Sequence, residues 1–155
     1  MTTTTADTST YAGGRRVLDA DSHVMELADF LDPYIDDEFR DRLKRHAVAA
    51  LEPVLDAAVR KAETRRSDPQ AAAEADERLL QDKGWNAIGA FDAEERKRAL
   101  DLFGFEGQLV FATFATALFA GRDVDRLYAG ASAQNKAIVD FCSHDERLLP
   151  VGYVP

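Results

Sequence analysis

The segment VLDADSHVME, residues 17–26, decides the fold of this chain and raises the first functional question. The apolar residues Val17 and Leu18 precede an Asp-x-His pair, and residues 16–21 have the pattern of a short buried strand. Side chains alternate between the two faces of a strand, so Asp21 and His23 are predicted to point the same way. A carboxylate and an imidazole side by side at the end of a strand can hold one metal ion. The segment therefore predicts a metal site, with Asp21 and His23 as two of its ligands.

A helical region is expected after this first strand. From residue 36 onward apolar residues recur every four positions, which is typical of a helix, and Pro53 is expected to divide the region in two. Ser67-Asp68-Pro69 has the residue types of a helix start, and Gly84 is expected to end that helix. The region is therefore predicted to form a helical insertion after the first strand.

The second half of the chain alternates strands with helices. Asp92 and Glu95 have the spacing of a capping box, and the helix that they begin should end at Gly104. Further elements are expected at residues 108–113 (strand), 123–143 (helix) and 148–154 (strand). The apolar stripe of the 123–143 helix is expected to comprise Val124, Leu127, Tyr128, Ala131, Ile138 and Cys142. This order predicts an α/β fold with about three parallel strands.

Length and composition limit the classes of protein to be considered. The chain has 155 residues, enough for one domain, and its formal net charge is −9, which disfavours nucleic acid and anionic membranes as partners. Cys142 is the single cysteine, which rules out an intrachain disulfide and suits the cytoplasm. No apolar run approaches the ~20 residues of a membrane span. Residues 1–14, which are Thr-rich at their start, are expected to form a disordered tail and not a secretory signal.

Several segments together resemble a known family. They are residues 19–26, Lys83-Gly84-Trp85 with residues 91–104, residues 108–113, and Asn135 with residues 141–150. In this order and spacing the chain resembles the amino-terminal part of the amidohydrolase-related family (amidohydrolase 2). That group includes aminocarboxymuconate-semialdehyde decarboxylase and related aromatic-acid decarboxylases. The resemblance extends from about residue 16 to the end of the chain.

The resemblance implies a (β/α)8 TIM barrel with one divalent metal ion at the carboxyl ends of its strands. Asp21 and His23 would be the first two ligands, with Zn²⁺ as the favoured metal; the oxygen donor makes Mn²⁺ or Mg²⁺ alternatives. A barrel of this type needs about 250 residues, so residues 15–155 are expected to be a partial domain, truncated at its carboxyl end. The other ligands and the catalytic acid or base would lie beyond Pro155, and the isolated chain is expected to be inactive.

Three functions follow from this resemblance and from the unpaired strands. The first is a metal-dependent hydrolase that cleaves a C–N or C–O bond of a small-molecule substrate with metal-activated water. The second is a metal-dependent non-oxidative decarboxylase of an aromatic or unsaturated carboxylic acid. The third is an inactive fragment that acts as an interaction module through its unpaired sheet edges. Homo-oligomerisation is left open by the sequence.

Four residues are candidates for contact with a substrate. Thr113 ends the second strand, on the side where barrel active sites lie, and Phe114 follows it as a wall for an aromatic substrate or as packing for the next helix. Trp85 is a substrate wall or an anchor for the insertion. Asn135 shares the inward face of its helix, where a buried amide needs partners, and a bridge to backbone groups is favoured over a role near the ligand.

Other polar residues have structural interpretations. Asp19 is expected to bond neighbouring backbone, whereas Glu26 is either a loop residue near the substrate or a solvated side chain. His46 is expected on the surface, and His144 at a helix end, where a cation suits the helix dipole. Cys142 is expected in the core.

Overall fold

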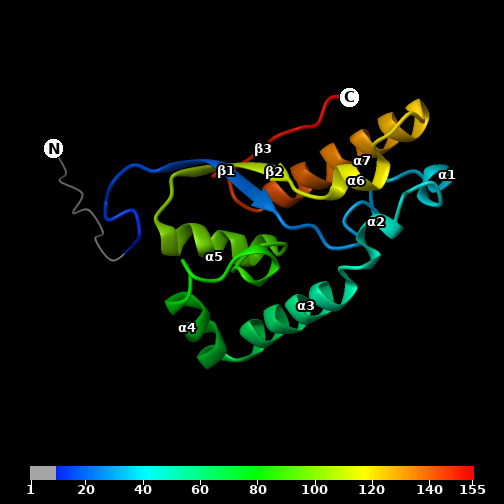
Figure 1. The fold of residues 1–155 in the computed structure, drawn as a ribbon. Helices are drawn as coiled ribbons and strands as arrows, with labels where there is room; N and C mark the ends of the chain where they lie inside the picture. Colours follow the sequence, from blue (N-terminus) through cyan, green and yellow to red (C-terminus); the bar gives the residue numbers. More distant parts are fainter. Residues whose placement is uncertain (1–9) are drawn as a thin grey trace.

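The computed structural model describes residues 10–155 and contains one three-stranded parallel sheet (Figure 1). The strands are β1 (Leu18–Val24), β2 (Gly107–Ala112) and β3 (Leu148–Pro150), in the spatial order β1-β2-β3. Both neighbouring pairs run parallel. The predicted α/β class with three parallel strands is therefore confirmed.

The first and third strands differ from their predicted bounds. β1 continues through His23 to Val24, because Ser22, His23 and Val24 pair with β2 beyond a register shift that follows Asp19. β3 ends at Pro150, four residues before its predicted end. The segment after β3 is held against the helix at residues 124–142, because the side-chain amide of Asn135 makes two hydrogen bonds to the backbone of Tyr153.

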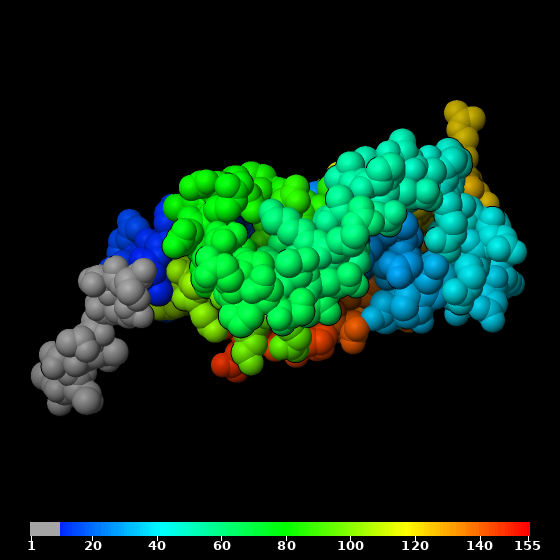
Figure 2. Space-filling model, turned by 90° about the horizontal axis from the view of Figure 1, so that it is seen from below, coloured from blue at the N-terminus to red at the C-terminus, as the bar shows by residue number. Residues whose placement is uncertain are grey.

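The helices of the described residues follow the predicted order, except that the helix at residues 115–119 lies in a segment where no element was expected. The bounds are α1 (Asp37–Arg40), α2 (His46–Ala49), α3 (Glu52–Ser67), α4 (Pro69–Glu77), a 3-10 helix η1 (Gly84–Asn86), α5 (Ala93–Phe103), α6 (Ala115–Phe119) and α7 (Val124–Cys142). The elements from α1 to η1 form the helical insertion between β1 and the crossover helix α5. Within it, α3 and α4 pack against each other, and their side chains cover much of the face shown in Figure 2.

Local capping explains why four helix ends were predictable. Asp68, Asp92 and Asp123 each cap a helix, with a side-chain oxygen that accepts from a backbone N–H two or three residues further on. Gly104 ends α5 with a φ of 71°, the left-handed conformation that glycine adopts without a steric penalty. The starts of α4, α5 and α7 and the end of α5 therefore lie where the sequence predicts them.

Two predicted helices are shorter in the structure. Between α1 and α2 the chain leaves helical geometry, and the backbone N–H of Lys44 donates instead to the carbonyl of Leu118 at 2.7 Å. The helix that begins at Pro69 ends at Glu77, well before Gly84. Asp82 pairs with both Lys61 and Arg78, and these ion pairs hold the 78–82 turn against α3.

One face of the sheet is covered and the other is open. Val24, Val110 and Leu148 pack on one side with residues of α5 and α7, where Cys142 is 4% exposed, as predicted. On the opposite face Leu109 is 38% and Leu149 48% exposed, and no helix of residues 10–155 covers them. The sheet is therefore one-sided within the part of the chain that the structure describes.

The stripe predicted for α7 is wrong at its amino-terminal end. Val124 and Tyr128 are both 60% exposed, whereas Ala131, Ile138 and Cys142 are buried. The first turns of α7 extend past the strands of the sheet (Figure 1).

The start of the described chain packs against α5. Ala12 is buried and its N–H donates to the carbonyl of Phe103 at 2.8 Å, while the ring of Tyr11 meets that of Phe103 edge-on. Tyr11 and Ala12 are therefore part of the packed structure and not of the expected tail, whose residues 1–9 lie outside the described residues. Among the described helices, none combines the length and the apolar character that a membrane crossing requires.

Candidate metal centre

The two predicted metal ligands lie next to each other at the carboxyl-terminal half of β1. The Oδ1 atom of Asp21 is 3.4 Å from Nε2 of His23. The Asp21 side chain is 92% exposed and that of His23 is 42% exposed. The alternation of strand side chains thus brings a hard oxygen donor and an imidazole nitrogen to one open place on the surface.

The imidazole of His23 is held by residues of β2. Its Nδ1 atom is 3.2 Å from Oγ1 of Thr113, and its ring stacks on that of Phe111 with centroids 5.6 Å apart. Both neighbours lie in the strand that pairs with β1 or directly after it. The ring orientation that directs Nε2 towards Asp21 is therefore set by the neighbouring strand.

The pair suits a divalent metal in donor type and in spacing. A separation of 3.4 Å equals the edge between two ligand atoms in a tetrahedral site with bonds of about 2.1 Å. Within residues 10–155 no group of three His, Cys, Asp or Glu side chains lies close enough to hold a metal ion. A metal ion bound by Asp21 and His23 would take its other ligands from water or from groups outside this part of the chain.

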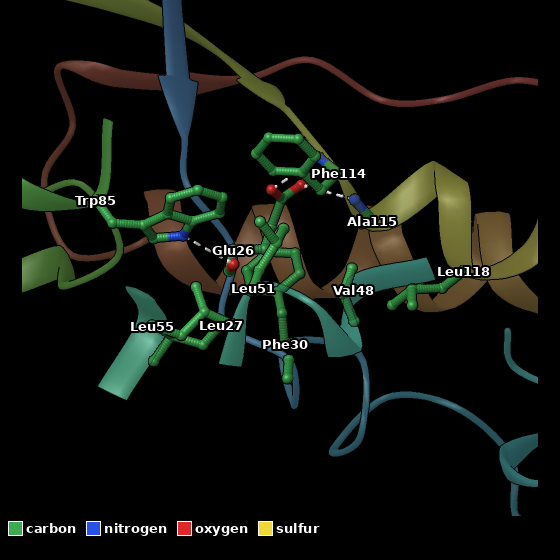
Figure 3. Close-up of a pocket in the computed structure, with 11 residues that line it drawn as sticks. Glu26, Leu27, Phe30, Val48, Leu51, Leu55, Trp85, Phe114, Ala115 and Leu118 are labelled. Carbon is green, nitrogen blue, oxygen red and sulfur yellow. Dashed lines mark hydrogen bonds between the residues drawn. The ribbon is translucent and has the colours of Figure 1, made fainter. Parts of the chain in front are cut away.

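Glu26 is a buried carboxylate and not a solvated one. It is 5% exposed, and its two oxygens accept from the backbone N–H groups of Thr113, Phe114 and Ala115 at 2.7, 2.9 and 3.1 Å. Two of these bonds are drawn in Figure 3. Glu26 thereby ties the loop that follows β1 to the loop that follows β2.

Trp85 and Phe114 are brought together next to Glu26 (Figure 3). Their rings stack with centroids 5.0 Å apart, and the indole N–H of Trp85 donates to the carbonyl of Glu26 at 3.2 Å. The apolar pocket beside them, which Leu51 and Leu55 also line, has about 10 Å³ of free volume, the size of one water molecule. In this structure the two rings anchor the insertion in a packed layer; contact with a substrate stays a prediction.

Asn135 lies apart from the Asp21–His23 pair. Its Nδ2 donates to the carbonyl of Tyr153 at 2.9 Å, and its Oδ1 accepts from the Tyr153 N–H at 2.7 Å. This is the favoured bridge between α7 and the segment after β3. Asp19 also bonds backbone as expected, since its Oδ1 accepts from the N–H of Asp21 at 3.1 Å.

Arg96, on α5, is a buried charge that the sequence reasoning did not single out. It is 6% exposed, and its guanidinium donates to the Gly89 carbonyl at 2.6 Å, the Ser22 hydroxyl at 2.7 Å and the His23 carbonyl at 2.6 Å. Burial lowers the pKa of Arg96 to about 10. Its spacing to the buried Ala99 and Leu100, three and four residues on, was a signal of its inward position.

A cavity of about 470 Å³ adjoins the pair. Its lining includes Asp21, His23, Met25, Lys83 and Arg96. The volume is in the range of small-molecule sites, and the wall combines polar and apolar groups. The cavity therefore has room for a small organic molecule beside the two candidate ligands.

Comparisons of the chain with protein-family models, with curated proteins and with solved structures found no match.

Proposed function

We propose that this chain contributes the first two ligands of a divalent metal centre in a metal-dependent hydrolase of the amidohydrolase-related type. The observation that supports the proposal is the approach of Asp21 Oδ1 to His23 Nε2 at 3.4 Å. A carboxylate oxygen and an unprotonated imidazole nitrogen are both electron-pair donors, so one cation can bind to both. Zn²⁺ is the first choice of metal, with Mn²⁺ and Mg²⁺ as alternatives.

The proposed architecture is the beginning of a (β/α)8 barrel. The parallel order β1-β2-β3, the helices on one face and the open opposite face agree with this fold, in which a barrel interior would lie against Leu109 and Leu149. Asp21 and His23 lie in the carboxyl-terminal half of β1, the side on which barrel enzymes place their active sites. The substrate proposed for the site is a small molecule with a C–N or C–O bond.

The residues of this chain would have distinct roles in that reaction. Asp21 and His23 hold the metal, which when bound polarises a carbonyl and lowers the pKa of water. Arg96 fixes the backbone of β1 at His23, and Glu26 fixes the loop that follows β2. The proposed proton donor or acceptor for the bond cleavage would come from strands outside the described residues.

Metal titration tests the proposal on the chain as it exists. We expect Zn²⁺ to bind with a stoichiometry of one by isothermal titration calorimetry, and the Asp21→Asn and His23→Ala variants to lose at least about tenfold in affinity. His144→Ala is the matched control, because His144 is exposed and lies next to an acidic residue at the end of α7. Equal affinities in all four proteins, or no binding by the wild type, would contradict the proposal.

The open sheet face favours a second candidate, a non-catalytic interaction module. Leu109 and Leu149 are exposed side by side on paired strands, and β3 leaves an unpaired edge within the described residues. This candidate predicts association with a second copy, measurable by light scattering, that Leu149→Lys abolishes. It also predicts that Asp21→Asn leaves this association unchanged.

A further inference from the structure

We propose that Thr113 is a positioning residue that sets the tautomer of His23 and so keeps Nε2 free to bind a metal. The inference rests on the proposed metal centre and deepens it. Thr113 is the first residue after β2, and its hydroxyl lies between the Nδ1 atom of His23 and the carbonyl of Val24.

The proton of the Thr113 hydroxyl has two acceptors within reach, the carbonyl of Val24 at 2.7 Å and, when it is unprotonated, Nδ1 of His23 at 3.2 Å; the shorter contact favours Val24. Oγ1 is 2.7 Å from the carbonyl oxygen of Val24, which can only accept, and 3.7 Å from the weakly accepting sulfur of Met25. A hydroxyl has a single proton, and we infer that it is donated to Val24, because that acceptor is nearer and cannot itself donate. Its lone pairs then face Nδ1 of His23 at 3.2 Å, and only a protonated Nδ1 makes this contact favourable.

The tautomer at Nδ1 determines what Nε2 can do. With the proton on Nδ1, the lone pair of Nε2 faces Oδ1 of Asp21 and is free for a metal ion. The Asp21 carboxylate, 3.4 Å from Nε2, competes with the Thr113 oxygen for the imidazole proton, so loss of the Thr113 oxygen shifts the proton towards Nε2. That second tautomer makes an ordinary His–Asp hydrogen bond and blocks the nitrogen that would bind the metal.

The position of the hydroxyl is itself fixed by a buried charge. Glu26 accepts from the N–H groups of Thr113 and of the two residues that follow it, and all three bonds are 3.1 Å or shorter. Glu26 is only two residues beyond Val24, the acceptor of the Thr113 proton. The segments that follow β1 and β2 are therefore held together by hydrogen bonds beside the contact between Thr113 and His23.

Nitrogen-15 NMR of the full chain tests this assignment without any metal. At about pH 8.5, where imidazoles are neutral, long-range proton–nitrogen correlations identify the protonated ring nitrogen. We expect the Nδ1–H tautomer for His23 in the wild type and a majority of Nε2–H in Thr113→Val. Zn²⁺ affinity should fall about 10- to 100-fold in that variant, the range for loss of a partner that orients a ligand. Thr113→Ser should restore both properties, because it keeps the hydroxyl.

Thr116→Val is the matched control. In the wild type the Thr116 hydroxyl donates to Gln134 at 3.0 Å and does not contact His23. Its loss should therefore change neither the His23 tautomer nor the Zn²⁺ affinity. Should Thr113→Val fail to fold, Thr113→Ala removes the hydroxyl without adding a methyl group. The Nε2–H tautomer in the wild type, or an unchanged Nδ1–H tautomer in both hydroxyl-free variants, would overturn the inference.

The two readouts separate this inference from the proposed function. If the wild type binds no Zn²⁺ but the tautomer of His23 differs between the wild type and the Thr113 variants, the role of Thr113 stands and the metal centre fails. If the wild type binds Zn²⁺ and the tautomer of His23 is the same in the wild type and in the Thr113 variants, the metal centre stands and the positioning role fails.

Discussion

At the scale of single residues, two buried charges fix the strand that carries the candidate ligands. Arg96 donates to the carbonyl of His23 from α5, and Glu26 accepts three N–H groups from the loop after β2. Hydrogen bonds to charged groups contribute more than bonds between neutral groups, about 1.5–3 kcal/mol each. The backbone around His23 is therefore more firmly held than its position near a strand end suggests.

Replacing Glu26 tests this interpretation. In Glu26→Gln the amide nitrogen would face a backbone N–H, so at least one donor loses its acceptor. We expect the free energy of unfolding to fall by about 2–3 kcal/mol, measured by urea denaturation with linear extrapolation. Glu146→Gln is the control, because Glu146 is exposed, and it should change stability by less than about 0.5 kcal/mol. Equal stabilities of the two variants would show that the three bonds contribute little.

At the scale of elements, α6 and α7 pack so closely that glycine is required where they meet. A Cβ atom built on Gly130 of α7 would lie 2.1 Å from Cγ of Phe119 in α6. Phe119 is fully buried and therefore has little room to move. This contact explains a glycine in the middle of a 19-residue helix, where helix propensity alone disfavours it by about 1 kcal/mol relative to alanine.

Two opposing effects decide how Gly130→Ala changes the stability of the protein, helix propensity and overpacking of the core. Helix propensity favours the variant by about 1 kcal/mol, whereas overpacking of a core costs about 1–3 kcal/mol. Because a 2.1 Å approach requires a backbone shift or a new position for Phe119, we expect overpacking to dominate and the melting temperature to fall. The control is Ser132→Ala on the exposed side of the same helix, which should raise the melting temperature slightly or leave it unchanged. A stabilised Gly130→Ala protein would contradict the packing described here.

At the scale of the whole molecule, the sheet buries one face and exposes the other. Val110 and Leu109 are neighbours in β2, but Val110 is 0% exposed under α5 and α7 while Leu109 is 38% exposed on the open face. The hydrophobic contribution of a side chain depends on the area that it removes from water. The smaller residue should therefore contribute more to stability than the larger one.

A pair of alanine substitutions tests the one-sided sheet. Val110→Ala leaves a cavity in the core and should cost about 2 kcal/mol of unfolding free energy. Leu109→Ala removes more atoms yet should cost less than about 1 kcal/mol in the isolated chain. The reverse order would mean that something covers the open face in solution, and sedimentation of the wild type would then identify a self-associated state.

Local signals made part of this structure predictable. Asp68, Asp92 and Asp123 act on backbone groups two or three residues away, and Gly104 acts on its own turn, so these helix ends needed no knowledge of the rest of the fold. The break between α1 and α2 and the early end of α4 depend on partners elsewhere, such as the Leu118 carbonyl that Lys44 reaches. Periodicity overestimated these helices because it does not include such competing bonds.

By itself the sequence determined the α/β order of elements and the placement of Asp21 and His23 on one side of β1. Both follow from local geometry, the 3.6-residue period of helices and the two-residue period of strands. Only the tertiary structure decided the burial of Glu26 and the contact of Thr113 with His23, which joins residues 90 positions apart. The physical reason is that the pairing of β1 with β2 brings the carboxyl-terminal ends of the two strands together. No pattern within either strand encodes the register of this pairing.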